Sequence, residues 1–297
     1  MKVVVTGAAG LLGRDVWRVF EAAHEMIAVG RTHPPQAAVE QWHECDLTDA
    51  ARVYGVVTRA NPDLVVHCAA YNNVDGAETS PNDAYKGNAL AVRNLALACQ
   101  RFDAELMTVS TDYVFDGTQA PESGYREFDV PHPLSRYGES KRWGECFAEQ
   151  LLNRFYVIRT SWLFGPARPT WVDSVASNIR GRRPIQAVSD MVSAPTYTPD
   201  LASAMFELAQ RHCFGYYHLT NQGFCSRVDL AEEVFRLHGS KDIALLNVKT
   251  QQELNLPARR PAFSGLQNLH WLLGGFQPLR PWKQALHDHF AKATAGR

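Results

Sequence analysis

Several specialised features are missing from this chain, beginning with an excess of charge of either sign. Its 297 residues carry 30 basic and 31 acidic side chains and a net charge of −1. Because nucleic-acid-binding domains and proteins that bind anionic membranes usually carry a basic excess, this balance argues against both partners. The chain also lacks internal repeats and low-complexity tracts. We therefore predict an ordinary folded protein that binds neither nucleic acid nor membrane.

Cysteine pairs and long apolar runs are also lacking. The six cysteines are scattered without a C-x-x-C pair, which fits neither a zinc site nor a disulfide framework. His287 and His289 are two positions apart on an expected helix, so they face different ways and argue against a metal site. The apolar start of the chain is too short for a signal peptide, and no run reaches transmembrane length. We expect a cytoplasmic protein with reduced thiols and no metal.

The segment 110–141 contains the groups with the clearest chemistry. Tyr137 and Lys141 are four residues apart, so on a helix they lie on one face. A phenol has a pKa near ~10 in water, and we expect the neighbouring ammonium to lower it toward working pH. Thr111 follows an apolar run, Leu106–Val109, that predicts a buried strand, and open α/β sheets bind ligands at the carboxyl ends of their strands. Hydroxyl, phenol and ammonium together can polarise a carbonyl group and protonate it.

Three glycines follow the first expected strand, residues 2–6. They allow a tight turn, close approach of the backbone to a pyrophosphate, and close packing of helix against strand. The next helix, predicted from residue 11 to about residue 23, would direct its amino terminus at the phosphates. Because the triad occupies the first strand–helix turn, which is the context that this mechanism requires, we predict a dinucleotide site. The residues assigned to it are Gly7, Gly10, Leu11, Leu12 and Gly13.

The second strand, predicted for Met26–Val29, should select the dinucleotide. An acidic residue near its end usually binds the ribose of a cofactor without a 2′-phosphate, whereas an arginine can pair with that phosphate. The sequence has Arg31 here, which favours NADPH. Two alternatives stay open: the cofactor is NADH, or Arg31 is an exposed arginine at the end of the strand without a role in binding. Asp46 and Leu47 follow a third strand, and Asp46 lies either near the adenine or at the cap of a helix beginning near Thr48.

A fourth strand, Leu64–His67, leads into small residues and then a polar loop, residues 72–75. Small side chains there would let a nicotinamide ribose lie against the backbone. Asn88, on a helix expected over residues 83–101, either fixes a backbone bend beside the strand that precedes Thr111 or lies on the helix surface. The cofactor-binding residues predicted on this segment are Cys68, Ala69, Ala70 and Tyr71.

Strands and helices alternate as far as the sixth strand, residues 155–159, which predicts an α/β fold with a Rossmann-like, doubly wound parallel sheet. A loop rich in Pro, Gly and Asp, residues 115–134, leads to the Tyr137 helix. Beyond Gly165, proline and arginine cluster and the helices become shorter. We predict a dinucleotide-binding domain and a smaller, mainly helical substrate-binding lobe. The first would comprise residues 1–165 and, as a return to the sheet, 199–223; the second would comprise 166–198 and 224–297.

Seven stretches carry a resemblance to a known family: Thr6–Gly13, Cys68–Asp75, Ser110–Gly117, Tyr137–Lys141, Arg159–Gly165, Ala194–Leu201 and Arg259–Ser264. They occur in the family's order and are spread along nearly the whole chain, which resembles the dTDP-4-dehydrorhamnose reductases. These are extended short-chain dehydrogenases/reductases, and the G-x-x-G-x-x-G spacing is typical of that class. The stretch Ser110–Gly117, STDYVFDG, is the most specific of the seven.

The resemblance implies that the chain reduces a 4-keto nucleotide sugar to its alcohol, with dTDP-4-dehydrorhamnose to dTDP-L-rhamnose as the leading case. Hydride would pass from nicotinamide C4 to the sugar carbonyl carbon. Tyr137 would donate the proton, Lys141 would hold the ribose and tune Tyr137, and Thr111 would hydrogen-bond the carbonyl oxygen; Tyr137 and Lys141 would thus also contact the cofactor. Trp162 matches a family tryptophan that contacts the sugar nucleotide, with a core tryptophan at a strand end as the alternative. The implied substrate-binding residues are Asn72, Val74, Thr111, Asp112, Tyr113, Trp162 and Arg260.

Three departures from the family pattern bear on the sugar and the nucleotide rather than on hydride transfer. Asn72 and Asn73 replace a small residue or threonine, and Trp143 replaces a usually smaller residue. The stretch Asp190–Thr196 lacks the glutamine and glycine of a family motif. The sequence does not identify the sugar of the substrate. It is compatible with a homodimer.

Two other functions remain as alternatives. One is a nucleotide-sugar 4-epimerase of the same superfamily, which Arg31 disfavours because such enzymes usually carry an acidic residue there. The other is a non-catalytic, NADP-binding regulatory subunit, in which the catalytic residues would normally have been lost. A dehydratase is disfavoured because Tyr113 stands where that class carries a glutamate.

Overall fold

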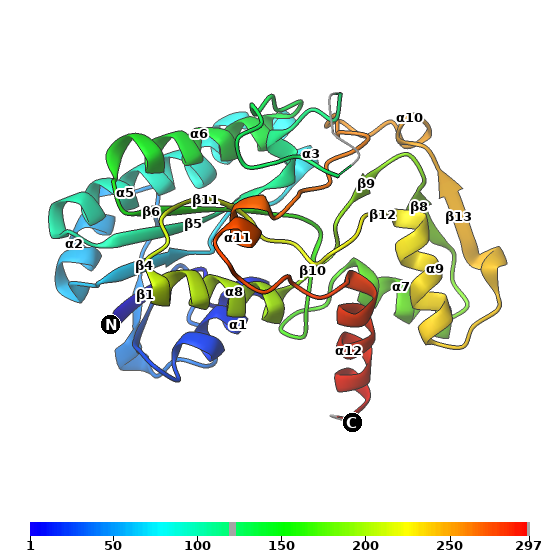
Figure 1. Cartoon of the computed structure of the whole chain (residues 1–297), viewed down its shortest axis with the longest axis horizontal. Helices are drawn as coiled ribbons and strands as arrows, with labels where there is room; N and C mark the ends of the chain where they lie inside the picture. Colours follow the sequence, from blue (N-terminus) through cyan, green and yellow to red (C-terminus); the bar gives the residue numbers. More distant parts are fainter. Residues whose placement is uncertain (119–122, 296–297) are drawn as a thin grey trace.

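A seven-stranded parallel sheet forms the centre of the structure (Figure 1). The computed structural model describes residues 1–118 and 123–295, so residues 119–122 of the predicted loop and the last two residues of the predicted lobe lie outside the described part. The strand order reverses between β1 and β4, which is where open α/β sheets bind ligands. The fold is therefore the predicted Rossmann-like, doubly wound α/β fold. In spatial order the strands are β11 (Gly215–His218), β6 (Phe155–Thr160), β5 (Glu105–Thr111), β4 (Leu64–His67), β1 (Lys2–Thr6), β2 (Glu25–Gly30) and β3 (Trp42–Glu44).

The strand predictions agree closely with the sheet because its strands are continuous apolar runs. Strands covered by helices on both faces must be apolar at successive positions, and this pattern is easy to read. The bounds of β1 and β4 are those predicted, and β5 ends at Thr111 as expected.

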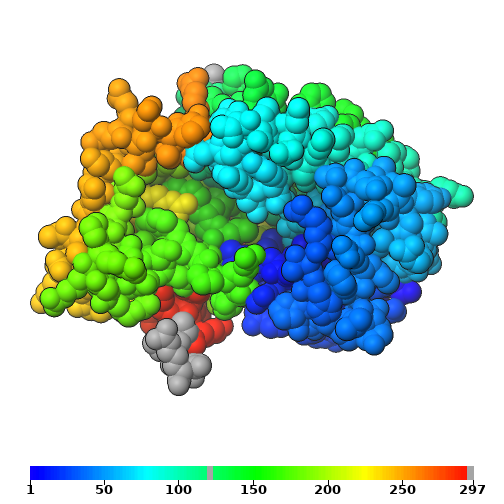
Figure 2. Space-filling view, turned by 180° about the vertical axis from the view of Figure 1, so that it is seen from behind, coloured from blue at the N-terminus to red at the C-terminus, as the bar shows by residue number. Residues whose placement is uncertain are grey.

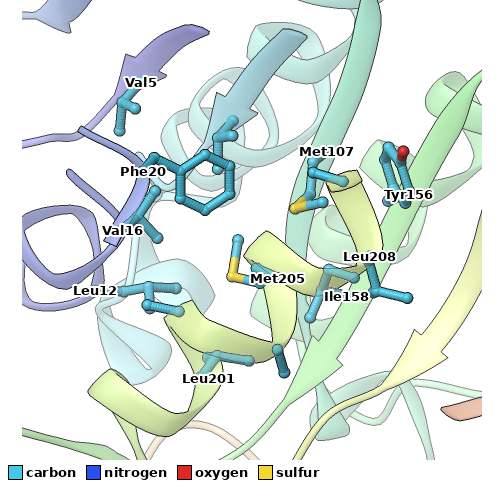
Figure 3. Packing of buried hydrophobic residues seen from close by; sticks show 14 of the residues in the cluster. Val5, Leu12, Val16, Phe20, Met107, Tyr156, Ile158, Leu201, Met205 and Leu208 are labelled. Atoms are coloured by element: carbon cyan, nitrogen blue, oxygen red, sulfur yellow. The ribbon is translucent and has the colours of Figure 1, made fainter. Parts of the chain in front are cut away.

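Helices α1 (Leu11–Phe20) and α8 (Thr198–Arg211) cover one face of the sheet. Figure 3 shows Val16 and Phe20 of α1 and Met205 of α8 directed into the same apolar layer as side chains from the strands. Helix α1 ends at Phe20, a few residues before the predicted end near residue 23. The chain turns toward β2 over residues 21–23.

Helices α2 (Ala50–Ala60), α5 (Ala91–Phe102) and α6 (Arg136–Leu151) cover the opposite face. The single helix predicted over residues 83–101 is interrupted. It consists of α4 (Pro81–Tyr85), a π-helical turn η2 (Lys86–Leu90) and α5. Apolar periodicity marks the helix but does not reveal one turn of wider winding.

A second apolar core lies in the C-terminal half, among α7 (Trp171–Arg180), α9 (Arg227–Leu237), α12 (Trp282–Ala295) and β8 (Ile185–Val188). Strand β11 joins the main sheet beside β6. Trp271 packs in the sheet-side core, so part of the segment 224–297 lies against the main sheet rather than in the second core. The functional division into cofactor and substrate domains stays a prediction.

The remaining elements are short connections and two-stranded pairings. They are α3 (Val74–Thr79), α10 (Gln251–Leu254), α11 (Leu269–Leu273), β7 (Leu163–Phe164), β9 (Val192–Ser193), β10 (Thr196–Tyr197), β12 (Cys225–Ser226), β13 (Leu246–Lys249), η1 (Val39–Gln41), η3 (Asp112–Val114) and η4 (Ile243–Leu245). None of the helices in the two described ranges combines the length and apolarity needed to cross a membrane.

Candidate active site

The glycine-rich turn between β1 and α1 has the geometry that a pyrophosphate requires. Gly7 has φ +68°, and a Cβ there would lie 2.6 Å from the amide nitrogen of Ala69 in the turn after β4. A Cβ on Gly13 would collide with the carbonyl oxygen of Gly7. Helix α1 begins at Leu11 behind Gly10, and no described side chain caps its first amides. Those amides face the switch point of the sheet and can bind an anion.

Arg31 and Asp46 lie at the edge of the sheet where an adenosine ribose would be expected. Arg31 is exposed at the end of β2, and its charge is close enough to lower the pKa of Asp46. The amide and hydroxyl of Thr48 both donate to the Asp46 carboxylate, and they are the main cause of this lowered pKa. The alternative that Asp46 caps α2 is wrong, because the cap is Asp49. Leu47 is buried under this edge.

The segment after β4 is held in place by Asn88, the central residue of the π-helical turn. Its side chain accepts from the amide of Tyr71 at 2.9 Å, and donates to the carbonyl of Tyr71 and to the Ser140 hydroxyl, each at 3.0 Å. Asn88 therefore fixes the backbone of Tyr71, the first of its two predicted roles. Cys68, Ala69 and Ala70 lie between β4 and this anchor, and burial raises the pKa of the Cys68 thiol to about 12.

The predicted polar loop 72–75 is shorter than expected, because α3 begins at Val74. Asn73 caps this helix by accepting from the amide of Gly76 at 2.9 Å. Asn72 is exposed immediately before the cap, at the same edge of the sheet. Val74 thus lies in the first turn of a helix rather than in a loop.

Thr111 and Tyr137 come together at the carboxyl end of β5, and a hydrogen bond joins the two side chains. Burial raises the pKa of Tyr137 above its ordinary value of 10.0; the bond to Thr111 lowers it in part, while Asp112 and Tyr113 raise it further. The predicted lowering of this pKa by Lys141 is therefore wrong for this structure. A phenol with a raised pKa stays protonated at neutral pH, so it can act as a proton donor.

Lys141 lies one turn along the same buried face of α6. Its ammonium donates to the carbonyl of Val109 on β5 at 3.0 Å. Burial lowers the pKa of Lys141 to about 8, although Glu145 and Cys68 favour the charged form. The lysine thus carries a positive charge over most of the neutral range, beneath the turn where the cofactor ribose was expected.

A buried network continues this face of α6. Glu145 accepts from the Ser110 hydroxyl at 2.6 Å, from Arg142 at 3.0 Å, and from two nitrogens of Arg159 at 2.9 Å each. Arg159 is 1% exposed and also lies over the rings of Phe115 and Tyr216. The network ties α6 to β5 and β6 directly below Thr111. Sequence reasoning missed Glu145, although its position four residues after Lys141 put it on the buried face.

Asp112 ties the same end of β5 to the C-terminal half of the chain. Its carboxylate accepts from the hydroxyls of Ser193 at 2.8 Å, Ser264 at 2.5 Å and Thr111 at 3.0 Å. Burial raises the pKa of Asp112 to about 6, while these three hydrogen bonds lower it. Asp112 is 2% exposed, and these hydroxyls give it a positioning role between β5 and the C-terminal half. Its contact with substrate stays a prediction.

Three other predicted substrate-binding residues gather beside Tyr137. The rings of Tyr113 and Tyr137 meet edge to face with their centroids 6.2 Å apart. Burial raises the pKa of Tyr113 to about 12. Arg260 pairs with both carboxylate oxygens of Asp75, at 3.0 and 2.8 Å, and also hydrogen-bonds Tyr113. Trp162 has φ +42°, a left-handed conformation that is rare for a bulky residue and typical of functional sites.

These residues line the region where the two halves of the chain meet. Figure 2 shows a hollow there, between the blue and cyan N-terminal part and the green and orange C-terminal part. Among residues 1–118 and 123–295, no cluster of three or more His, Cys, Asp or Glu side chains could hold a metal ion.

The parallel sheet, the glycine turn at its switch point and the Thr–Tyr–Lys set define a short-chain dehydrogenase/reductase, a class of oxidoreductases. The RmlD substrate binding domain family matches residues 1–295. The dTDP-4-dehydrorhamnose reductase of Streptomyces griseus is 36% identical over 301 residues, covering 99% of this chain and 94% of the relative. The chain therefore belongs to the dTDP-4-dehydrorhamnose reductase family.

Two further similarities show the range of this family. A probable dTDP-4,6-dihydroxy-2-methyloxan-3-one 4-ketoreductase of Streptomyces antibioticus is also 36% identical, covering 99% of this chain and 96% of the relative. A crystal structure of dTDP-4-dehydrorhamnose reductase from Bacillus anthracis, in complex with NADP, is 33% identical and superposes with a TM-score of 0.85. That similarity covers 98% of this chain and 100% of the other.

Proposed function

We propose that the chain is an NADPH-dependent reductase of a 4-keto nucleotide sugar, with dTDP-4-dehydrorhamnose as substrate and dTDP-L-rhamnose as product. The observation that carries this proposal is the hydrogen-bonded pair Thr111–Tyr137 beside the glycine turn, with Lys141 beneath it. The names of the relatives and the NADP bound to the Bacillus anthracis protein support the substrate class and the cofactor.

In this function NADPH supplies a hydride to the carbonyl carbon of the sugar. The residues of the chain bind and orient the two reactants and supply the proton. The Tyr137 phenol, which burial keeps protonated, donates its proton to the carbonyl oxygen. The Thr111 hydroxyl, which donates to Asp112 in this structure, would turn to donate its hydrogen bond to the same oxygen once substrate is bound. The ammonium of Lys141 holds the ribose hydroxyls. The free amides at the start of α1 bind the pyrophosphate.

The direct test is oxidation of NADPH in the presence of dTDP-4-dehydrorhamnose generated by the upstream enzymes. Turnover, with dTDP-L-rhamnose identified as the product, is the expected result. Turnover only with a different dTDP-linked 4-keto sugar would support the proposed reaction class but show that the substrate is not dTDP-4-dehydrorhamnose. NADPH binding without turnover of any 4-keto sugar would instead favour the regulatory-subunit alternative.

We predict that Arg31→Asp weakens NADPH binding at least about 10-fold more than NADH binding, because a carboxylate would repel the 2′-phosphate that the guanidinium pairs with. Dissociation constants for both cofactors, measured by calorimetry, check this. Arg52→Asp is a matched control, since Arg52 is an exposed arginine of the neighbouring helix α2. Equal losses for NADPH and NADH in the Arg31 variant would contradict the assignment.

The pH dependence of turnover should follow Lys141. Because burial lowers its pKa to about 8, the ammonium is present below that pH and is lost as the pH rises through it. We expect kcat/KM for NADPH to fall above pH about 8, since this ratio reports groups of the free enzyme. Lys141→Arg keeps its charge at every accessible pH, so its residual activity should lack this decline. An unchanged decline in the variant would assign it to another group.

A further inference from the structure

Arg227, the first residue of α9, lies at the edge of the proposed substrate site in an unusual environment. Its guanidinium carbon is 3.8 Å from the ring centroid of Trp162 and 4.9 Å from that of Trp171. Stacking on an aromatic face holds the plane of a guanidinium and leaves the N–H groups around its edge available. Trp162 is the residue that the family resemblance assigns to the sugar nucleotide.

The charge of Arg227 is not neutralised by a direct partner. Within the described ranges of the chain, its guanidinium makes neither a hydrogen bond nor an ion pair, and it stacks on the two tryptophan rings. Tyr113, Cys225 and Asp112 favour its charged form only through space, and the three hydroxyls described above bind the Asp112 carboxylate. The nearby Arg260 adds a second positive charge, and Asp75 pairs with that one.

Burial of an unpaired cation is unfavourable, and burial lowers the pKa of Arg227 accordingly. Arginine is the residue that proteins favour for interface ion pairs and for phosphate recognition. The amino terminus of α9 itself is already occupied, because Ser226 and Asp229 form its capping box. An anion at this point would therefore bind through the side chain of Arg227.

We propose that Arg227 binds the diphosphate of the nucleotide sugar and holds it beside the face of Trp162. This inference rests on the proposed function, whose substrate contains this group. A guanidinium fork matches two phosphate oxygens at once, which an ammonium cannot do. Arg227 is thereby a specificity-determining residue: it selects nucleoside diphosphates over nucleosides. Sequence reasoning missed it, because an arginine at a helix start carries no signal of what it stacks on.

Binding of dTDP, UDP and thymidine to wild-type protein and to two variants tests the proposal. Arg227→Met keeps an unbranched apolar side chain against Trp162 and removes the donors. It should lower the affinity for the nucleoside diphosphate by about 10- to 100-fold and leave that for thymidine within about threefold. Arg227→Lys keeps the charge and loses the two-pronged guanidinium geometry. Its affinity for the nucleoside diphosphates should therefore lie between those of the wild-type protein and Arg227→Met. With substrate, KM should rise while kcat changes little.

A matched control is Arg236→Met, which removes one exposed arginine from the same helix. Arg236→Met should leave the affinities for dTDP, UDP and thymidine unchanged. The two Arg227 variants should likewise bind NADPH as tightly as the wild-type protein does. Equal losses of dTDP and thymidine in Arg227→Met would overturn the proposal in favour of a packing role, and so would unchanged dTDP and UDP affinities. Wild-type protein that binds neither diphosphate would overturn it as well.

These measurements need no turnover, so they separate the two proposals. If no 4-keto sugar is reduced but Arg227→Met selectively loses dTDP, the diphosphate site stands and the proposed reaction fails. If the sugar is reduced with an unchanged KM in the variant, the reaction stands and the role of Arg227 fails.

Discussion

Replacing Tyr137 with phenylalanine should lower kcat by about 10²- to 10⁴-fold while leaving NADPH affinity within about threefold. The ring and its packing stay, so only the proton donor and its hydrogen bond to Thr111 are lost. Because a donor that acts in the transition state contributes to kcat more than to binding, single-turnover reduction should slow by the same factor. Stopped-flow oxidation of bound NADPH measures this step, and calorimetry measures the affinity.

Tyr113→Phe is the matched control, since it removes a phenol hydroxyl from the neighbouring ring. We expect it to raise KM and to change kcat by less than about 10-fold, because the Tyr113 hydroxyl bonds Arg260 rather than Thr111. A Tyr137→Phe variant with wild-type kcat would show that another group donates the proton. A larger kcat loss in Tyr113→Phe than in Tyr137→Phe would reverse the two roles.

Replacing Glu145 with alanine should destabilise the protein by about 3–5 kcal/mol, because it leaves Arg159 buried without its carboxylate. Burial alone would raise the pKa of Glu145, but Arg159 and the Ser110 hydrogen bond outweigh it and keep the pKa below the ordinary value of 4.5. The ion pair thus stabilises the fold above that pH, and its contribution is lost as the pH falls through the lowered pKa. Thermal and urea unfolding measure the change.

Glu139→Ala is the control on the same helix. Glu139 pairs with Arg136 in solvent, and such pairs contribute at most about 1 kcal/mol. A Glu145 variant as stable as this control would mean that Arg159 finds another partner when its carboxylate is removed. Activity of the folded Glu145 variant should also fall, because Ser110 directly precedes Thr111 and loses its acceptor.

Much of the fold could be predicted because it depends on local pattern. Strands β1 and β4 are continuous apolar runs, and the glycine triad directly follows the first strand, which is the context that a dinucleotide site requires. Position in the sheet then brings Thr111 and Tyr137 together, since both lie at its carboxyl end. These inferences use only neighbours in the sequence and the rules of parallel sheets.

What could not be predicted depends on contacts between distant residues. The raised pKa of Tyr137 follows from its burial among side chains of α3, α4 and the turns beside them, which a Tyr-x-x-x-Lys spacing does not reveal. The role of Asp112 depends on Ser193 and Ser264, which lie 81 and 152 residues away along the chain. The stacking of Arg227 depends likewise on two tryptophans from other elements.

The π-helical turn around Asn88 bears on how sequences of this family should be aligned. Such a turn holds one more residue than an α-helical turn, so deleting a residue within Lys86–Leu90 would leave a continuous helix with a different phase. The side chain at position 88 would then rotate away from Tyr71, and the turn after β4 would lose its anchor. A one-residue gap at this point in a related sequence therefore marks a change in the turn after β4, although the helix itself is preserved.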